Sequence, residues 1–185
     1  MIEKLLKKIA SCLDKAEIDY MIIGGQAVLL YGSPRLTRDI DITLGIDTDE
    51  FAEVRKVCRQ LGLKILAKNP EGFAKDTKVL PAEDVKSKIR VDFIFSFTPY
   101  EQQALKRTRK VKMGGYPVKF ASCEDVIIHK MFAARAIDDE DVKGMLIRHK
   151  GKIDVKYIKK WLAEFSQLPG QERISTKFGT LFSML

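Results

Sequence analysis

The chain has 185 residues, of which 45% are hydrophobic and 31% charged, the balance of a folded protein with one well-buried core rather than a disordered chain. A net charge of +8 and a pI near 9.3 favour anionic partners, although lysines mixed with glutamates are also typical of an ordinary solvated surface. No apolar stretch is long enough to span a bilayer, and the cysteines at positions 12, 58 and 123 form no close pair. These features predict a protein of the reducing cytoplasm with no membrane partner.

The first half of the chain predicts helices that alternate with short strands. Apolar residues at three-four spacing predict a first helix that begins near Ile2 and ends near Ala16. A polar stretch around Asn69 and Gly72 is typical of a mobile loop. Between them we expect a strand over Tyr20–Ile23, a helix over Gln26–Tyr31, a strand over Asp39–Leu44, a helix over Glu50–Leu61 and an edge strand over Leu63–Leu66.

The second half begins with strands and becomes helical from Ser122. Alternation predicts a strand over Lys88–Phe95, and a hairpin follows whose turn through Gly114 and Gly115 is longer than the tightest type. The segment beyond Pro169 leaves a further helix open. The hairpin strands are expected over Thr108–Met113 and Val118–Ala121, and the helices over Glu124–Ala134, Asp138–Arg148 and Asp154–Phe165. We therefore expect an α/β (α+β) fold, with a mixed sheet in a core over residues 1–121 and a helical segment over 122–185 packed on that core.

Three aspartates stand where neighbouring strands would bring carboxylates together. Asp39 and Asp41 are two residues apart in one strand, so both side chains face the same side, about 6 to 7 Å apart. Asp92 lies in a later strand on the face opposite Val91, and an adjacent strand would bring it within about 5 Å of the pair. Such carboxylates repel one another unless a divalent cation or neighbouring arginines neutralise them. The pattern predicts a site for magnesium, with two ions about 4 Å apart, and phosphoryl or nucleotidyl transfer as its chemistry.

A glycine pair and a basic turn supply candidate phosphate-binding groups. Gly24 and Gly25 stand between a strand and a helix, where backbone N–H groups can approach a triphosphate closely. Arg35 and Arg38 precede the aspartates. An Asp-x-Asp pair alone is more often solvated or paired with arginine, so the order of these features together is what favours a site.

At these residues the chain resembles the DNA polymerase beta-type nucleotidyltransferase superfamily. The shared motifs are Ile23-Gly24-Gly25, Asp39-Ile40-Asp41-Ile42 and Val91-Asp92-Phe93. The chain is also similar to the abortive-infection, AbiEii-like toxin branch of that superfamily, in Arg35 and Thr37 before the aspartates and in a helical motif made of Lys130, Arg135, Asp138 and Asp141.

The resemblance implies a role for each motif. Asp39, Asp41 and Asp92 would be catalytic and would bind the metal, and the glycine turn, with Arg35 and Thr37, would bind the nucleotide. Lys130 would act in catalysis and Arg135 in nucleotide binding, although ion pairs on a helix surface explain both residues almost equally well. One departure is Gln26, which stands where the toxin branch usually has a small hydroxyl residue. Nucleotide choice or activity would depend on it.

The function expected from these residues is transfer of a nucleoside monophosphate from a nucleoside triphosphate, with release of pyrophosphate. The acceptor would be RNA such as tRNA, a protein hydroxyl or a small molecule, and two Mg²⁺ ions would be the cofactor. The alternative is a non-catalytic nucleotide-binding protein of the same fold, or one half of a toxin-antitoxin pair with a cognate antitoxin as its partner.

Overall fold

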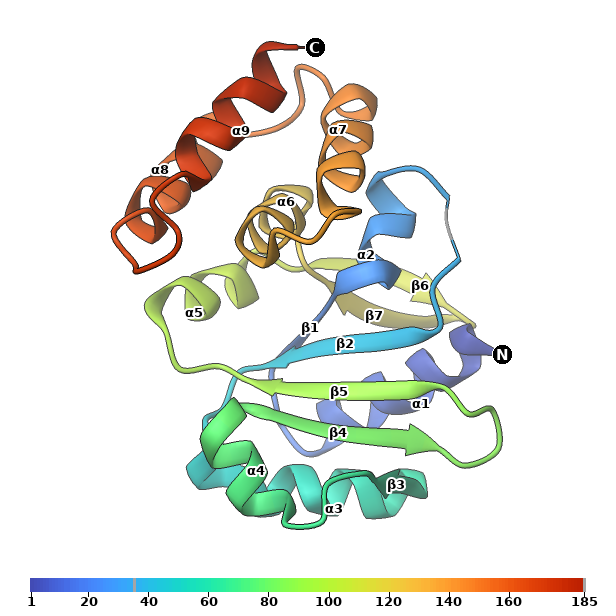
Figure 1. The fold of residues 1–185 in the computed structure, drawn as a ribbon. Coiled ribbons are helices and arrows are strands. Elements are labelled where there is room, and N and C mark those ends of the chain that lie inside the picture. The colour runs from blue at the N-terminus through green and yellow to red at the C-terminus, as the bar shows by residue number, and fades with distance from the viewer. Residues whose placement is uncertain (35, 185) are drawn as a thin grey trace. The chain divides into compact units, whose positions relative to one another are not determined.

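The computed structural model of the protein describes residues 1–34 and 36–184 (Figure 1). The chain forms two compact units, the first from Met1–Gln26 and Thr37–Ala121, and the second from Ala27–Leu36 and Ser122–Leu185. The first unit ends at Ala121, the same residue at which the core was expected to end. The helical unit, however, also includes residues from the first half of the chain. The expected domain limits themselves stay a prediction.

The first unit contains the sheet. Among the described residues, seven strands form one mixed sheet in the order β3-β4-β5-β2-β1-β7-β6. The strand β2 lies near its middle, antiparallel to β1 and parallel to β5. The strands are β1 (Tyr20–Ile23), β2 (Asp39–Leu44), β3 (Leu63–Ile65), β4 (Val79–Asp84), β5 (Arg90–Phe95), β6 (Arg109–Met113) and β7 (Tyr116–Phe120). The mixed α/β architecture expected from the sequence is confirmed.

Helices of the first unit bury the apolar face of this sheet. The helix α1 (Ile2–Lys15) packs on β6, β7 and α3, and α3 (Phe51–Leu61) follows a short 3-10 turn, η1 (Thr48–Glu50). Phe51 of α3 lies 6.4 Å from Phe95 between ring centroids, so α3 covers the face of β5 that carries Phe95. Asp92 lies an odd number of residues from Phe95 and therefore points to the other face. The remaining helices of this unit are α4 (Pro70–Thr77) and α5 (Pro99–Lys106).

The second unit is helical. Its helices are α6 (Cys123–Ala133), α7 (Asp138–Arg148), α8 (Val155–Phe165) and α9 (Ile174–Ser183), together with the end of α2 (Gly24–Tyr31), which begins in the first unit. Arg148 of α7 donates a hydrogen bond of 2.9 Å to the Gly32 carbonyl, which fastens the end of α2 to this unit. In the described part of the chain, no helix combines the length and the apolar character needed to cross a membrane.

Two short segments differ from the sequence expectation because of local hydrogen bonding and turn geometry. The stretch after Asn69 is the helix α4 rather than a mobile loop, since the Asn69 side chain accepts a hydrogen bond of 3.3 Å from the Gly72 N–H and Pro70 occupies the first turn. The hairpin turn is also tighter than expected. Met113 pairs with Tyr116, so only two glycines form the turn, and both have positive φ.

Other differences extend the predicted set of elements. The strand β4 and the helix α5 were not predicted, and the segment beyond Pro169, which was left open, contains the helix α9. The helix α2 begins at Gly24 rather than at Gln26. The glycine pair is therefore the first turn of that helix and not a separate turn before it.

Candidate active site

The carboxylates of the first unit form an ordered array on one face of the sheet. Asp41 of β2 is the register partner of Asp92 of β5, and Asp39 is the partner of Arg90. Partners on adjacent strands point to the same side, with their Cα atoms about 4.8 Å apart. Three carboxylates and one guanidinium thus occupy a two-by-two block that opens toward solvent at Asp39, the most exposed of the three aspartates.

Arg90 holds the Asp92 carboxylate in this block. Its Nε donates to both carboxylate oxygens of Asp92 at 2.9 Å, and the Asp92 side chain is 17% exposed. These hydrogen bonds, reinforced by the charges of Asp39 and Asp41 against the opposing effect of burial, raise the pKa of Arg90 above its ordinary value. From the sequence, Arg90 was one of three arginines considered as a partner of Asp41, and the structure pairs it with Asp92 instead, beside which the same i, i+2 alternation places it.

The array fits magnesium in donor chemistry and in strand register. Carboxylate oxygens are the hard ligands that Mg²⁺ prefers, and three of them face the same side of two adjacent strands. The side chains themselves are not arranged as ligands, because among the described residues no three acidic, histidine or cysteine side chains lie together at metal-binding spacing. Asp92 would have to exchange Arg90 for the ion, and metal binding by Asp39, Asp41 and Asp92 stays a prediction.

The glycine pair lies directly against this array. Gly24 has φ +61°, and a side chain there would bring its Cβ to 2.8 Å from Cγ of Asp41. A Cβ on Gly25 would lie 2.8 Å from Cβ of Thr37. Both positions therefore require glycine, and the Asp41 carboxylate lies at the first turn of α2. Free N–H groups at a helix start favour negative charge, either that of Asp41 or that of a bound phosphate.

Gln26 has a structural place in this region. Its side chain is 6% exposed, and its Nε2 donates a hydrogen bond of 3.3 Å to the Asp39 carbonyl, which connects the first turn of α2 to the start of β2. The residue that departs from the toxin-branch pattern thus helps position the backbone that carries Asp39. Nothing in the sequence alone indicated this contact.

Of the predicted nucleotide-binding residues, Thr37 lies in the first unit against Gly25, as described above. Arg35 lies outside the described residues. Arg38, which precedes the aspartates, is exposed to solvent.

Lys130 and Arg135 belong to the second unit, where Lys130 forms buried ion pairs and the exposed Arg135 side chain adds a pair at the surface. Lys130 is 3% exposed, and its Nζ lies 2.7 Å from Asp138 and 2.9 Å from Asp141, which are themselves 1% and 6% exposed. The backbone N–H of Arg135 donates to Asp138 at 2.9 Å and its Nε at 3.2 Å. The motif therefore joins the end of α6 to the start of α7. The pairs of Lys130 are therefore not on a helix surface, whereas the Arg135 side chain is exposed, and the catalytic role of the motif stays a prediction.

The pKa of Asp138 reflects this network. Burial by itself would raise the pKa of the carboxyl, but hydrogen bonds from Lys130 and from the Arg135 backbone outweigh it and hold the pKa below its ordinary value. Asp138 is thus ionised in the folded protein near neutral pH.

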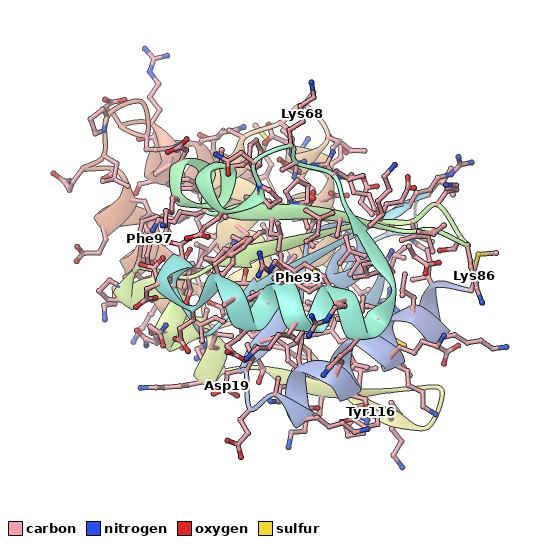
Figure 2. The ribbon with its side chains drawn as sticks, turned by 90° about the horizontal axis from the view of Figure 1, so that it is seen from below. Asp19, Lys68, Lys86, Phe93, Phe97 and Tyr116 are labelled. Carbon is pink, nitrogen blue, oxygen red and sulfur yellow. The ribbon has the colours of Figure 1, made fainter. Side chains whose placement is uncertain are left out.

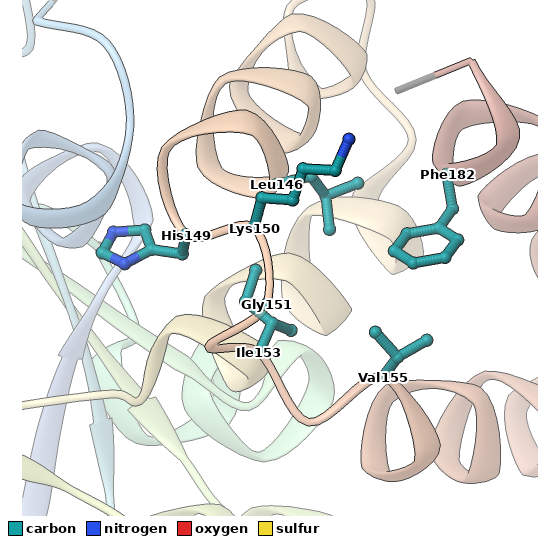
Figure 3. A pocket seen from close by; sticks show the side chains of 7 residues that line it. All are labelled: Leu146, His149, Lys150, Gly151, Ile153, Val155 and Phe182. Carbon is teal, nitrogen blue, oxygen red and sulfur yellow. The ribbon is translucent and has the colours of Figure 1, made fainter.

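A separate cavity of about 280 Å³ lies within the second unit (Figure 3). It is enclosed mainly by the apolar side chains of Leu146, Ile153, Val155 and Phe182, while the His149 ring points away from Phe182. None of the residues predicted from the sequence to act in catalysis or binding lines it. The cavity is therefore not part of the candidate site.

Comparison with known proteins agrees with the fold and the motifs. Similar solved structures include the antibiotic-resistance factor ANT(2'')-Ia in solution, with 16% identity over 89% of this chain and 91% of that one and a TM-score of 0.60. A nucleotidyltransferase-like antigenic protein from Paracoccidioides brasiliensis has 15% identity over 95% and 92%, with a TM-score of 0.57. The lincosamide antibiotic adenylyltransferase LnuA, with lincomycin bound, has 17% identity over 81% and 97%, with a TM-score of 0.55. At these identities the likeness concerns the fold.

A comparison with curated protein sequences gives no significant match. A family model, by contrast, matches residues 2–178, nearly the whole chain, and its family is described as "Nucleotidyl transferase of unknown function (DUF2204)". The superfamily expected from the motifs is thereby confirmed, while the toxin branch stays a prediction. The chain belongs to this family of nucleotidyl transferases and is an enzyme of that class.

Proposed function

We propose that the protein is a magnesium-dependent nucleotidyltransferase whose site is the array of Asp39, Asp41 and Asp92. The observation that carries the proposal is the register of β2 and β5, which pairs Asp41 with Asp92 and leaves Asp39 on the same face. The first turn of α2 at Gly24 supports it, because a helix start beside the carboxylates is suited to the phosphates of a nucleoside triphosphate.

The reaction follows from these groups. An acceptor hydroxyl oxygen attacks the α-phosphorus, a new P–O bond forms, and the bond between the α-phosphorus and the bridging oxygen breaks, so that pyrophosphate leaves with that electron pair. Asp92, once released from Arg90, would take the hydroxyl proton. Asp39, Asp41 and Asp92 would hold Mg²⁺, which supplies alignment of the phosphates and neutralises the charge that develops. Thr37 and the backbone at Gly24 and Gly25 would orient the triphosphate.

The acceptor class is RNA, a protein hydroxyl or a small molecule. The structural relatives include a protein named as an adenylyltransferase of lincosamides and a complex with adenylyl-2''-tobramycin, so antibiotics with free hydroxyls belong in any acceptor panel. We place the enzyme in the cytoplasm, in keeping with three free cysteines.

The second candidate is nucleotide binding without turnover, as in a regulatory protein or one half of a toxin-antitoxin pair with its cognate antitoxin. The observation that favours it is the engagement of Asp92 by Arg90, which takes one carboxylate away from a metal. The two candidates differ in whether pyrophosphate is released.

A labelled-nucleotide assay separates them. The protein is incubated with Mg²⁺ and each triphosphate carrying an α-phosphate label, against total RNA, tRNA, a protein mixture and hydroxylated antibiotics. We expect the label to enter one acceptor class and the Asp41→Asn variant to abolish transfer while melting no lower than wild type in chelator. The Glu53→Gln variant, which changes an exposed carboxylate on α3, is the matched control and should keep full activity. Magnesium-dependent binding without release of pyrophosphate would favour the regulatory candidate, and transfer that survives Asp41→Asn would refute the assigned site.

A further inference from the structure

The surface formed by α1 and α3 carries a basic groove that takes no part in the proposed reaction. Figure 2 looks onto this surface, where the two helices run side by side with nitrogen-tipped side chains along them. The groove has a volume of about 570 Å³ and is lined by Lys7, Lys8, Lys15 and Gln60, among others. Cys12 of α1 and Gln60 of α3 both line the groove, and Sγ of Cys12 donates a hydrogen bond of 3.0 Å to Oε1 of Gln60, which connects the two helices.

The basic residues of this surface follow from the pattern of each helix. In α1, Leu5, Leu6, Ile9 and Leu13 are buried, which leaves Lys4, Lys8 and Lys15 on the outer side. In α3 the buried stripe leaves three basic residues outward, Arg55, Lys56 and Arg59, which line a second, smaller depression of about 330 Å³. Successive lysines of α1 are thus separated by about 6 Å and about 10 Å along the helix axis. This is a row of cations and not a single point charge.

In the described chain, several of these cations lie outside ion-pair distance of an acidic side chain, although Lys8 is near enough to Asp84 to interact with its charge. Within the described residues, Lys8, Lys15 and Arg59 form no ion pair, whereas nearby Lys56 is paired with Glu53 at 2.8 Å. Asp14 of α1 lies 3.1 Å from Lys119, so its charge is partly offset from the other side. The groove therefore keeps a net positive charge that a polyanion could neutralise.

The composition of the surface selects among polyanions. The large hydrophobic side chains that are exposed include Leu66, Phe73 and Phe97, but none within α1 or α3 in the described chain. A membrane-surface helix needs apolar residues to enter the lipid, and a protein interface of ordinary affinity needs aromatic or aliphatic anchors at its centre. A row of lysines and arginines without such anchors matches instead the repeated charge of a phosphate backbone.

We propose that the groove between α1 and α3 binds the phosphate backbone of RNA without reading its sequence. The absence of exposed aromatic side chains along α1 and α3 of the described chain excludes stacking of bases, so the row of cations would bind mainly through phosphates. The α3 helix covers the face of β5 opposite Asp92, so this groove is a docking surface separate from the carboxylate array. It would hold a polynucleotide whether or not that polynucleotide is the acceptor.

The test is binding of a fluorescent 20-nucleotide oligouridine by anisotropy across a series of salt concentrations. Each phosphate contact on a single strand contributes about 0.7 to the slope of log K against log salt. The Lys8→Gln/Lys15→Gln/Arg59→Gln variant should therefore bind at least tenfold more weakly at 0.1 M salt and should lose about 2 from that slope. Glutamine is a good helix former, so both helices should persist. The pair Lys8→Gln/Lys15→Gln replaces the triple variant if its thermal melt shows misfolding.

The matched control removes the same charge elsewhere in the same unit. Arg109, Lys110 and Lys112 are exposed residues of the edge strand β6, and their triple change to glutamine should leave RNA binding within twofold. The Asp41→Asn variant should also bind RNA normally, which makes failure here distinguishable from failure of the proposed enzyme activity. The proposal is overturned if wild type does not bind the oligonucleotide, if the β6 variant loses as much affinity as the groove variant, or if phosphatidylserine vesicles bind through the groove and RNA does not.

Discussion

Replacing Arg90 by glutamine should destabilise the metal-free protein and strengthen its binding of magnesium. Arg90 is the cation of the carboxylate block, where its Nε lies 2.9 Å from both oxygens of Asp92. Its side chain is 53% exposed, so solvent screening limits this ion pair to about 1 kcal/mol. Without it, Asp41 and Asp92 remain as neighbouring charges, and two such charges about 5 Å apart repel by about 3 kcal/mol at an effective dielectric constant of about 20, before further screening by solvent.

The net loss should be about 1 to 2 kcal/mol in chelator, which for a chain of this length corresponds to about 2 to 8 °C in melting temperature. Magnesium should then bind the variant about fivefold more tightly than wild type, because about 1 kcal/mol is no longer spent in displacing Arg90 from Asp92. Thermal melts with chelator and with increasing Mg²⁺, together with calorimetric titration, measure both effects.

Lys88→Gln is the matched control for this experiment. It removes a cation two residues before Arg90 whose Nζ lies 3.2 Å from Glu83, the neighbour of Arg90 on β4, and it should change the melt and the metal affinity much less than Arg90→Gln does. The reasoning is refuted if Arg90→Gln melts as high as wild type in chelator, or if magnesium shifts both proteins equally.

Three further changes test the surroundings of the site and the helical unit. Gly24→Ala places a side chain at φ +61° against the Asp41 carboxylate, and it should cost about 1 to 3 kcal/mol of stability and weaken triphosphate binding. Gly62→Ala is the control, because Gly62 has φ +67° but open space around it. In the same melts and titrations it should lose only the stability that backbone strain accounts for. Lys130→Met removes the cation that two buried carboxylates share and should cost about 3 to 5 kcal/mol in urea unfolding, while Lys143→Met, at an exposed pair, should change stability by less than about 0.5 kcal/mol. Because the folded pKa of Asp138 is depressed, the stability it contributes is present above its unfolded pKa of about 4 and is lost as pH falls through the folded pKa. The stability of Asp138→Asn should therefore depend less steeply on pH below about 4, and an acid unfolding series parallel to that of wild type would contradict this.

The aspartates were predictable because side chains along a strand alternate between its two faces. This alternation does not depend on exactly where the strand begins and ends. Asp39 and Asp41 lie on the same face of β2 wherever the strand begins or ends, because they are two residues apart. Asp92 is recognisable because it is a charged residue between apolar residues of a strand. The sequence predicted that Asp92 lies close to the Asp39 and Asp41 pair, but not that it lies directly opposite Asp41. The register of two strands depends on how they pair and cannot be read from either strand alone. Arg90 was expected as a possible partner of Asp41, whereas its partner in the structure is Asp92, two residues away in the same strand.

Other elements were missed for local reasons. The strand β4 contains Pro81 although it lies between two other strands, and proline in a sheet interior argues against a strand from sequence. The helix α5 did carry a signal, because Thr98 and Glu101 form a capping box around Pro99, and this signal was overlooked. The burial of Lys130 was beyond sequence reasoning, since it depends on α6 and α7 meeting at an angle that no periodicity fixes.

The discontinuity of the helical unit has a consequence for how the chain folds. Its first part, Ala27–Leu36, is synthesised before the whole of Thr37–Ala121, yet it contacts residues that come only afterwards, through Tyr31 with His149 and Gly32 with Arg148. Closing a loop of that length costs entropy before any contact is gained, so assembly of this unit should be a late, slow event compared with hairpin formation in the sheet. Until then the apolar side of α2, with Val28 and Tyr31 buried in the finished protein, is exposed on the nascent chain. A shortened gene product that stops at residue 121 would retain that exposed surface permanently and should aggregate.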